Sequence, residues 1–296
     1  MRSFTLEYLV EARTTNFVVD LFRSPLEACD TAVARSAGVS QPSSSPLLFS
    51  CSRQDWYGVV GQADLRTKCA MGLDDPLADA LSRTLSSIRT EETMRPVRRR
   101  WDVAGGSLSV PRYLSGDPLA FRHRVKGRAR SRTMEVIILP SIDCTVSVRE
   151  SQTVGRCMGQ VLGLLRGMGY SIGISTVSMA KFLRNHPTDH IHGMDVRIKE
   201  PSDVFNPRKI SLALSRVLSR ALFLGLIMQD PIYSQSYNRI LLPPMYDDVL
   251  FDIIDTFHPG EKVVFDANDM IDRLRNGWTE ERCVDLLLSS VTDYHS

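Results

Sequence analysis

The clearest pattern of hydrophobic and polar positions lies between residues 133 and 176. An apolar run from Met134 to Leu139 precedes a loop rich in Ser, Asp and Thr, and a second apolar run begins at Tyr170. Between them, residues 152–168 carry apolar side chains at helical spacing. This stripe consists of Val154, Cys157, Met158, Val161, Leu162 and Leu165. The order strand, loop, helix, strand predicts a βαβ unit, with a ligand crevice where the first strand ends.

Strand and helix patterns continue to alternate toward the end of the chain. Strand patterns occur at residues 97–103, 194–199, 239–244 and 262–266, and helical patterns at residues 207–228, 246–257, 267–275 and 279–290. Such alternation predicts an α/β fold with a Rossmann-like, mostly parallel sheet.

The first third of the chain has a different pattern. Residues 6–11, 25–34, 63–71 and 76–88 predict helices, and the Ser- and Pro-rich residues 36–52 predict a loop. We therefore expect a mainly helical N-terminal region over residues 1–94, with the loop at 36–52, and an α/β domain over residues 95–296.

Charge is distributed unevenly, although the formal net charge is only +2. Residues 95–132 contain eleven Lys or Arg and two Asp, which gives +9, and residues 244–296 contain twelve acidic and four basic residues, which gives −8. Charges at every second position of an extended chain share one face, which suits a phosphate backbone. The candidate nucleic-acid-binding residues are Arg122, Arg124, Lys126, Arg128, Arg130 and Arg132. The alternative is a solvated basic loop that pairs with the acidic C-terminal segment.

Two stretches have the residue types of a divalent-cation site. Asp143, Thr145 and Ser147 alternate along the loop after the first strand, and their oxygens suit a hard cation, although such residues are also usual before a helix. His186, His190 and His192 cluster in a predicted loop over residues 184–193, close to Asp189 and Asp195. Imidazoles at this spacing could hold zinc or act on a phosphoester, and the alternative is a polar surface loop. We expect no cofactor other than such a cation.

Several classes of protein are excluded by what the sequence lacks. Its six cysteines include no C-x-x-C pair, which argues against zinc ribbons and thioredoxin-like sites and favours reduced thiols. The nucleotide-binding motifs G-x-G-x-x-G and G-x-x-x-x-G-K-S/T do not occur, nor does the G-x-S-x-G motif of hydrolases. Because no signal-like start and no window of 18 apolar residues is present, we expect a soluble intracellular protein without a membrane partner.

Two segments carry a resemblance to an uncharacterised bacteriophage and viral family. Residues 98–105 and 110–118 match its W-D-V-x-G and V-x-R-Y-L-x-G-x-P motifs, and the similarity extends over residues 56–244. The resemblance implies a viral or phage protein located in the cytoplasm of a host cell, with association to the virion left open. It implies no activity, because none is established for that family.

The βαβ unit also resembles a von Willebrand factor A-type domain. In that family the first strand ends in D-x-S-x-S, whose carboxylate and hydroxyls hold a divalent cation, and here Asp143, Thr145 and Ser147 fit D-x-T-x-S. The resemblance implies a von Willebrand A-like α/β fold as an alternative to the Rossmann-like one.

Together these patterns predict a binding protein more strongly than an enzyme. We expect a non-enzymatic viral or phage protein that contacts nucleic acid or a protein partner. One alternative is a metal-dependent enzyme on nucleic acid or a phosphoester, which would use the histidines with Asp143. Another is a virion or assembly protein that self-associates through its charge asymmetry.

Overall fold

A computed structural model describes residues 2–10, 13–37, 58–88, 99–102, 107–116, 120–124, 132–140, 146–182, 189–228, 240–241 and 254–292. The strands are β1 (Arg2–Val10), β2 (Arg13–Phe22), β3 (Arg99–Asp102), β4 (Ser107–Leu108), β5 (Phe121–Arg124), β6 (Thr133–Leu139), β7 (Ser171–Phe182), β8 (Asp189–Lys199), β9 (Ile240–Leu241) and β10 (Lys262–Asp266). The helices are α1 (Pro25–Ala37), α3 (Gln62–Met71), α4 (Pro76–Ile88), α5 (Val110–Leu114), α6 (Val148–Gly167), α7 (Pro207–Leu214), the π-helix η3 (Val217–Phe223), α8 (Leu224–Met228), α11 (Ala267–Arg275) and α12 (Glu280–Thr292).

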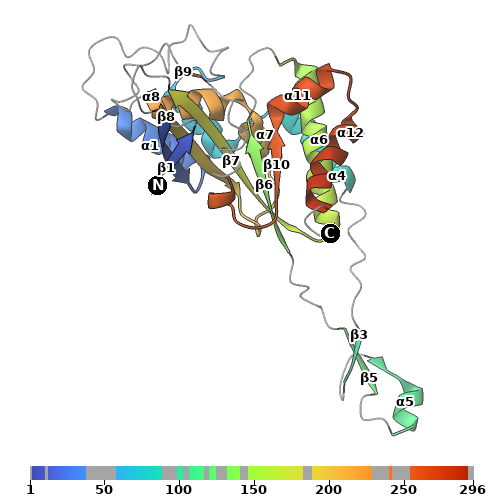
Figure 1. Ribbon diagram of the computed structural model, residues 1–296. Coiled ribbons are helices and arrows are strands. Elements are labelled where there is room, and N and C mark those ends of the chain that lie inside the picture. The colour runs from blue at the N-terminus through green and yellow to red at the C-terminus, as the bar shows by residue number, and fades with distance from the viewer. Residues whose placement is uncertain are drawn as a thin grey trace.

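The main sheet confirms the predicted α/β class (Figure 1). Its strand order is β1-β2-β8-β7-β6-β10, and β9 pairs with β7. β6 runs parallel to both of its neighbours, β7 and β10, as a βαβ unit requires. β8 runs antiparallel to β7 and parallel to β2, and β1 is antiparallel to β2. The sheet is therefore mixed, with its parallel part centred on β6.

The helix predicted at residues 6–11 is wrong, because residues 6–10 lie in β1. β1 and β2 form a hairpin, and β2 then extends the sheet beside β8 from Thr15 paired with Asp189 to Phe22 paired with Val196. The predicted helices at 25–34, 63–71 and 76–88 are confirmed as α1, α3 and α4. The loop predicted at 36–52 lies outside the described residues apart from its first two, which end α1.

Helix α6 packs on the sheet as its apolar stripe predicted. All six residues of the stripe are at most 2% exposed, and they join β6 residues such as Val136 and Ile138 in the large core. Figure 1 shows α4, α11 and α12 around α6. α4 comes so close that a Cβ at Gly155 would lie 2.8 Å from the carbonyl oxygen of Leu77, and one at Gly159 would lie 2.8 Å from Cβ of Thr84.

The long helix predicted at residues 207–228 is broken into α7, η3 and α8. The break occurs at Ser215, whose backbone is extended and whose hydroxyl donates to the carbonyl oxygen of Leu212 and accepts from the amide of Val217. Serine competes in this way with the backbone bonds of a helix. In the part of the chain that the structure describes, no single helix is long and apolar enough to cross a membrane, whereas α7 and residues 217–227, bent by 66°, reach that composition only together.

The N-terminal elements share the large core with the later part of the chain. Leu65 and Leu81, from α3 and α4, are buried in the same cluster as Leu162 of α6 and Phe265 of β10. On the opposite face of the sheet, a smaller apolar cluster gathers Ile137, Val19, Val177, Met179 and Ile254. Whether residues 1–94 and 95–296 fold as separate units stays a prediction.

Candidate nucleic-acid interface

A second, three-stranded sheet lies between α4 and β6 in the chain (Figure 1). Its order is β3-β5-β4, and both pairings are antiparallel. The predicted strand at 97–103 is thus confirmed in part as β3, and α5 follows it after β4. α5 starts with Pro111 among its first two positions, where a proline needs no amide partner, and Gly116 with φ of 75° follows its end. We call β3, β4, β5 and α5 the basic sheet.

The register of this small ladder places arginine positions opposite or beside one another. Arg99 lies directly opposite Arg124, and Trp101 lies opposite Arg122. Directly opposed residues of antiparallel strands share a face, and like charges in that relation destabilise the pair. One face of the ladder therefore holds three arginine positions and a tryptophan position.

Three of the six basic residues predicted for nucleic-acid contact lie in the described part of the chain. Arg122 and Arg124 lie in β5, which has the extended conformation that the charge pattern requires. Arg132 is exposed just before β6, and its carbonyl oxygen accepts from the amide of Ser171 at 2.8 Å. The other three, Lys126, Arg128 and Arg130, lie outside the described residues.

The sequence did not reveal that Arg99 and Arg100 belong with these residues. Both lie in β3, and the ladder pairs Arg100 with His123 and Arg99 with Arg124. The strand-like pattern of residues 97–103 and their charge were visible in the sequence. The pairing partner was not, because a ladder register depends on contacts between separated segments.

The proposed cation loop follows the carboxyl end of β6, where the crevice was expected. β6 is an inner strand between β7 and β10. Asp143 and Thr145 lie outside the described residues, whereas Ser147 is the N-cap of α6. The helix therefore starts four residues earlier than the predicted 152.

Ser147 takes part in a capping box. Its hydroxyl accepts from the amide of Glu150 at 3.2 Å, and the Glu150 carboxylate accepts from the amide of Ser147 at 2.6 Å. The pKa of Glu150 is lowered to about 2, mainly by the hydrogen bond from the Arg275 guanidinium and to a smaller extent by the hydrogen bonds with Ser147. Ser147 therefore stabilises the N-terminus of α6 as its N-cap.

The loop predicted over residues 184–193 extends too far, because its second half lies in a strand. β8 already begins at Asp189, so His190 and His192 lie in a strand beside β2 and β7, and His186 lies outside the described residues. His192 is 2% exposed, and its Nε2 lies 3.3 Å from Oδ2 of Asp20, which also accepts from Arg35 at 3.0 Å. His192 is therefore part of a buried polar group beneath α1.

A second polar group lies on the opposite face of the sheet and was not predicted. Arg197 of β8 donates to Glu135 of β6, and Ser175 of β7 donates to the same carboxylate at 3.4 Å. Burial raises the pKa of Glu135, and the charge of Arg197 opposes that rise. Gly173 leaves room for this carboxylate, because a Cβ there would lie 2.3 Å from Oε2 of Glu135.

His258 extends this polar group beside the small apolar cluster. Its Nε2 lies 2.8 Å from Oδ2 of Asp195, and both residues are 8% exposed. The contact joins the segment after residues 254–257 to β8, which is a structural role. Within the described residues, no group of three or more His, Cys, Asp or Glu side chains is arranged to hold a metal ion.

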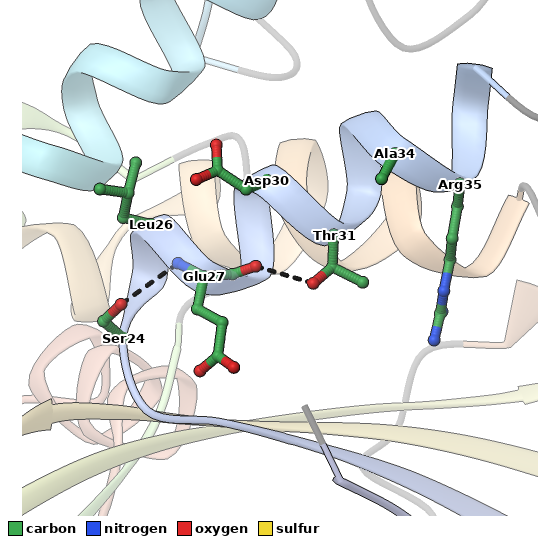
Figure 2. Close-up of a pocket in the computed structure, with 7 residues that line it drawn as sticks. All are labelled: Ser24, Leu26, Glu27, Asp30, Thr31, Ala34 and Arg35. Carbon is green, nitrogen blue, oxygen red and sulfur yellow. Dashed lines mark hydrogen bonds between the residues drawn. The ribbon is translucent and has the colours of Figure 1, made fainter.

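A broad concavity of about 860 Å³ runs beside α1 (Figure 2). Its polar side chains include Ser24, which accepts from the amide of Glu27 at 3.2 Å, and Thr31, which donates to the carbonyl oxygen of Glu27 at 2.8 Å. Arg35, at the far end of the helix in Figure 2, pairs with Asp20. These contacts cap the helix and join it to the sheet.

Residues 14–244 match a family model described as a domain of unknown function, DUF7192. The match covers most of the chain, and the protein therefore belongs to this uncharacterised family. It includes the basic sheet, β6, α6, β7 and β8, and it ends before β10. No curated protein and no solved structure matched the chain.

Proposed function

We propose that this protein binds nucleic acid through the basic sheet, and that it acts as a binding protein without catalysing a reaction. The observation that carries the proposal is the register of β3 and β5, in which Arg99 faces Arg124 and Trp101 faces Arg122. Opposed arginines cost stability in the free protein, and phosphates between them would turn this cost into attraction.

The composition of the basic sheet supports the same conclusion. Its strands and helix contain five arginines and one aspartate, so the net charge of these elements is +4. Phosphate contacts of this kind supply affinity without reading the base sequence. The proposed binding is therefore insensitive to sequence and strongly dependent on salt.

The decisive experiment measures binding of a labelled oligonucleotide by fluorescence anisotropy between about 50 and 300 mM salt. The test variant replaces Arg122 and Arg124 by Gln. The matched control replaces two exposed helical arginines, Arg66 of α3 and Arg83 of α4, so that it loses the same charge elsewhere.

The test variant should bind more weakly, and the slope of log affinity against log salt should fall by about 1.4–1.8 for two lost phosphate contacts. The control variant should retain the slope of the unmodified protein. If both variants lose affinity equally, the binding depends on the overall charge of the protein and not on the basic sheet. If the unmodified protein shows no salt-sensitive binding, the proposal is refuted.

We further propose a viral or phage origin, which rests on the resemblance carried by residues 98–118. The von Willebrand A-like description likewise rests on the D-x-T-x-S match of residues 143–147. In the alternative of a metal-dependent enzyme, His186, His190, His192 and Asp143 would hold the cation. Engagement of His192 Nε2 by Asp20 disfavours that alternative, and metal analysis of the purified protein tests it.

A further inference from the structure

Helix α5 exposes an apolar surface beside the basic strands. Val110 is 57% exposed, Tyr113 is 60% exposed and Leu114 is 78% exposed. No residue of this helix is buried. Adjacent apolar side chains that remain accessible to water are typical of a surface that contacts a ligand.

The backbone fixes this helix to the basic ladder. The amide of Ser109, the residue before α5, donates to the carbonyl oxygen of Ala120 at 2.8 Å. Ala120 is 2% exposed and precedes β5, and Leu108 of β4 pairs with Phe121 of β5. Both ends of the connection between β4 and β5 are therefore held, and Tyr113 lies in the same small unit as Arg122.

The ligand must match an exposed aromatic ring and arginines within one unit. Unpaired nucleotides offer both features, because their base faces stack on aromatic side chains while their phosphates meet cations. A duplex offers the phosphates but keeps its base faces within its own stack. An acidic protein would match the charge, but it does not present an aromatic base beside each negative charge for stacking on Tyr113.

We propose that α5 makes the basic sheet selective for single-stranded nucleic acid, with Tyr113 as a platform on which a base stacks. This inference rests on the proposed function, since the arginines of β3 and β5 supply the phosphate contacts. Tyr113 adds the contact that a duplex cannot use. Selectivity for single strands is thus assigned to α5, and salt dependence to the ladder.

The experiment compares two probes of equal length, a labelled 20-nucleotide thymidine oligomer and a labelled 20-base-pair duplex. The variants are Tyr113→Ala, Tyr113→Phe, which keeps the ring, and Val204→Ala, which shortens an apolar side chain that is 81% exposed outside the basic sheet. Circular dichroism spectra verify that each variant folds, and anisotropy titrations give the affinities.

Tyr113→Ala should lower affinity for the single strand by roughly 5- to 150-fold, the range for loss of one stacked base. Its duplex affinity and its salt slope should remain those of the unmodified protein. Tyr113→Phe and Val204→Ala should bind both probes within about twofold of the unmodified protein, since a stacking ring needs no hydroxyl.

Three results would overturn the inference. The first is an equal loss on both probes in Tyr113→Ala, and the second is no loss on either. The third is displacement of the thymidine oligomer by polyglutamate at equal charge concentration, which would assign the surface to an acidic protein partner. If the unmodified protein binds neither probe, the proposed function itself fails, which separates its failure from that of the stacking role.

Discussion

Substitution of Gly72 should destabilise the protein far more than substitution of a glycine with the same φ in open space. Gly72 ends α3 with φ of 83° and ψ of −174°, a conformation that side chains with a Cβ rarely adopt. A Cβ at this position would lie 2.4 Å from the carbonyl carbon and 2.5 Å from the carbonyl oxygen of Arg208. The obstacle is backbone, so it cannot be relieved by rotation of a side chain.

The magnitude follows from three costs in Gly72→Ala. Backbone strain contributes about 1–3 kcal/mol. The crowding of α7 adds about 1–3 kcal/mol. Loss of the 2.9 Å hydrogen bond from the amide of Leu73 to the carbonyl oxygen of Arg208 adds about 1 kcal/mol. The total is about 3–7 kcal/mol, a large share of the roughly 5–15 kcal/mol that stabilises a typical domain.

Gly277→Ala is the matched control for this prediction. Its φ is 84°, but nothing lies within 4 Å of a Cβ at that position, so only the strain of about 1–3 kcal/mol applies. Urea unfolding monitored by circular dichroism gives both free energies. If the two variants lose equal stability, the contact between α3 and α7 has no energetic weight and the reasoning fails.

Three further predictions concern the core and the sheet. Gly159→Ala should be at least about 1 kcal/mol less stable than Gly167→Ala in urea unfolding, because a Cβ at Gly159 meets Thr84 whereas Gly167 has open space; equal stability would contradict this. Lys199→Met should lower the free energy of unfolding by about 1–3 kcal/mol, because the ammonium donates to the carbonyl oxygens of Ile172 at 2.7 Å and Glu200 at 2.8 Å. Unchanged stability in urea unfolding would refute that role. Burial raises the pKa of Glu135 above its usual 4.5, so the protonated form favours folding, and this contribution is lost as pH rises from about 4.5 through the raised pKa. In Glu135→Gln the unfolding free energy should not show this fall with rising pH. If the variant and the unmodified protein give parallel curves of unfolding free energy against pH, the prediction is wrong.

The elements that the sequence predicted are those defined by contacts near in the chain. The stripe of α6 repeats every three to four residues, and all six of its members are buried. β10 and α11 were also predicted with their observed bounds, because Asp266 ends the strand and caps the helix by accepting from the amides of Asn268 and Asp269. Periodicity and caps are local signals, so they are visible without the tertiary structure.

The elements that were missed depend on distant partners. Residues 6–11 have a helical pattern of apolar side chains, but the hairpin of β1 and β2 joins β8, which lies far along the chain. The sequence predicts His192 in a loop, either as a metal ligand or as polar surface, whereas in the structure it lies in the interior with its Nε2 beside Asp20. The opposed arginines of the basic sheet are likewise invisible without the ladder register.

The basic sheet enters the chain between α4 and β6, and none of its strands contributes to the main sheet. Removal or replacement of residues 99–124 would leave every ladder pairing of the main sheet and the described contacts of α6 in place. Substitution of its charges or of the exposed Tyr113 should therefore leave the interior undisturbed. The basic sheet is therefore the natural segment to exchange when the α/β body is used as a scaffold.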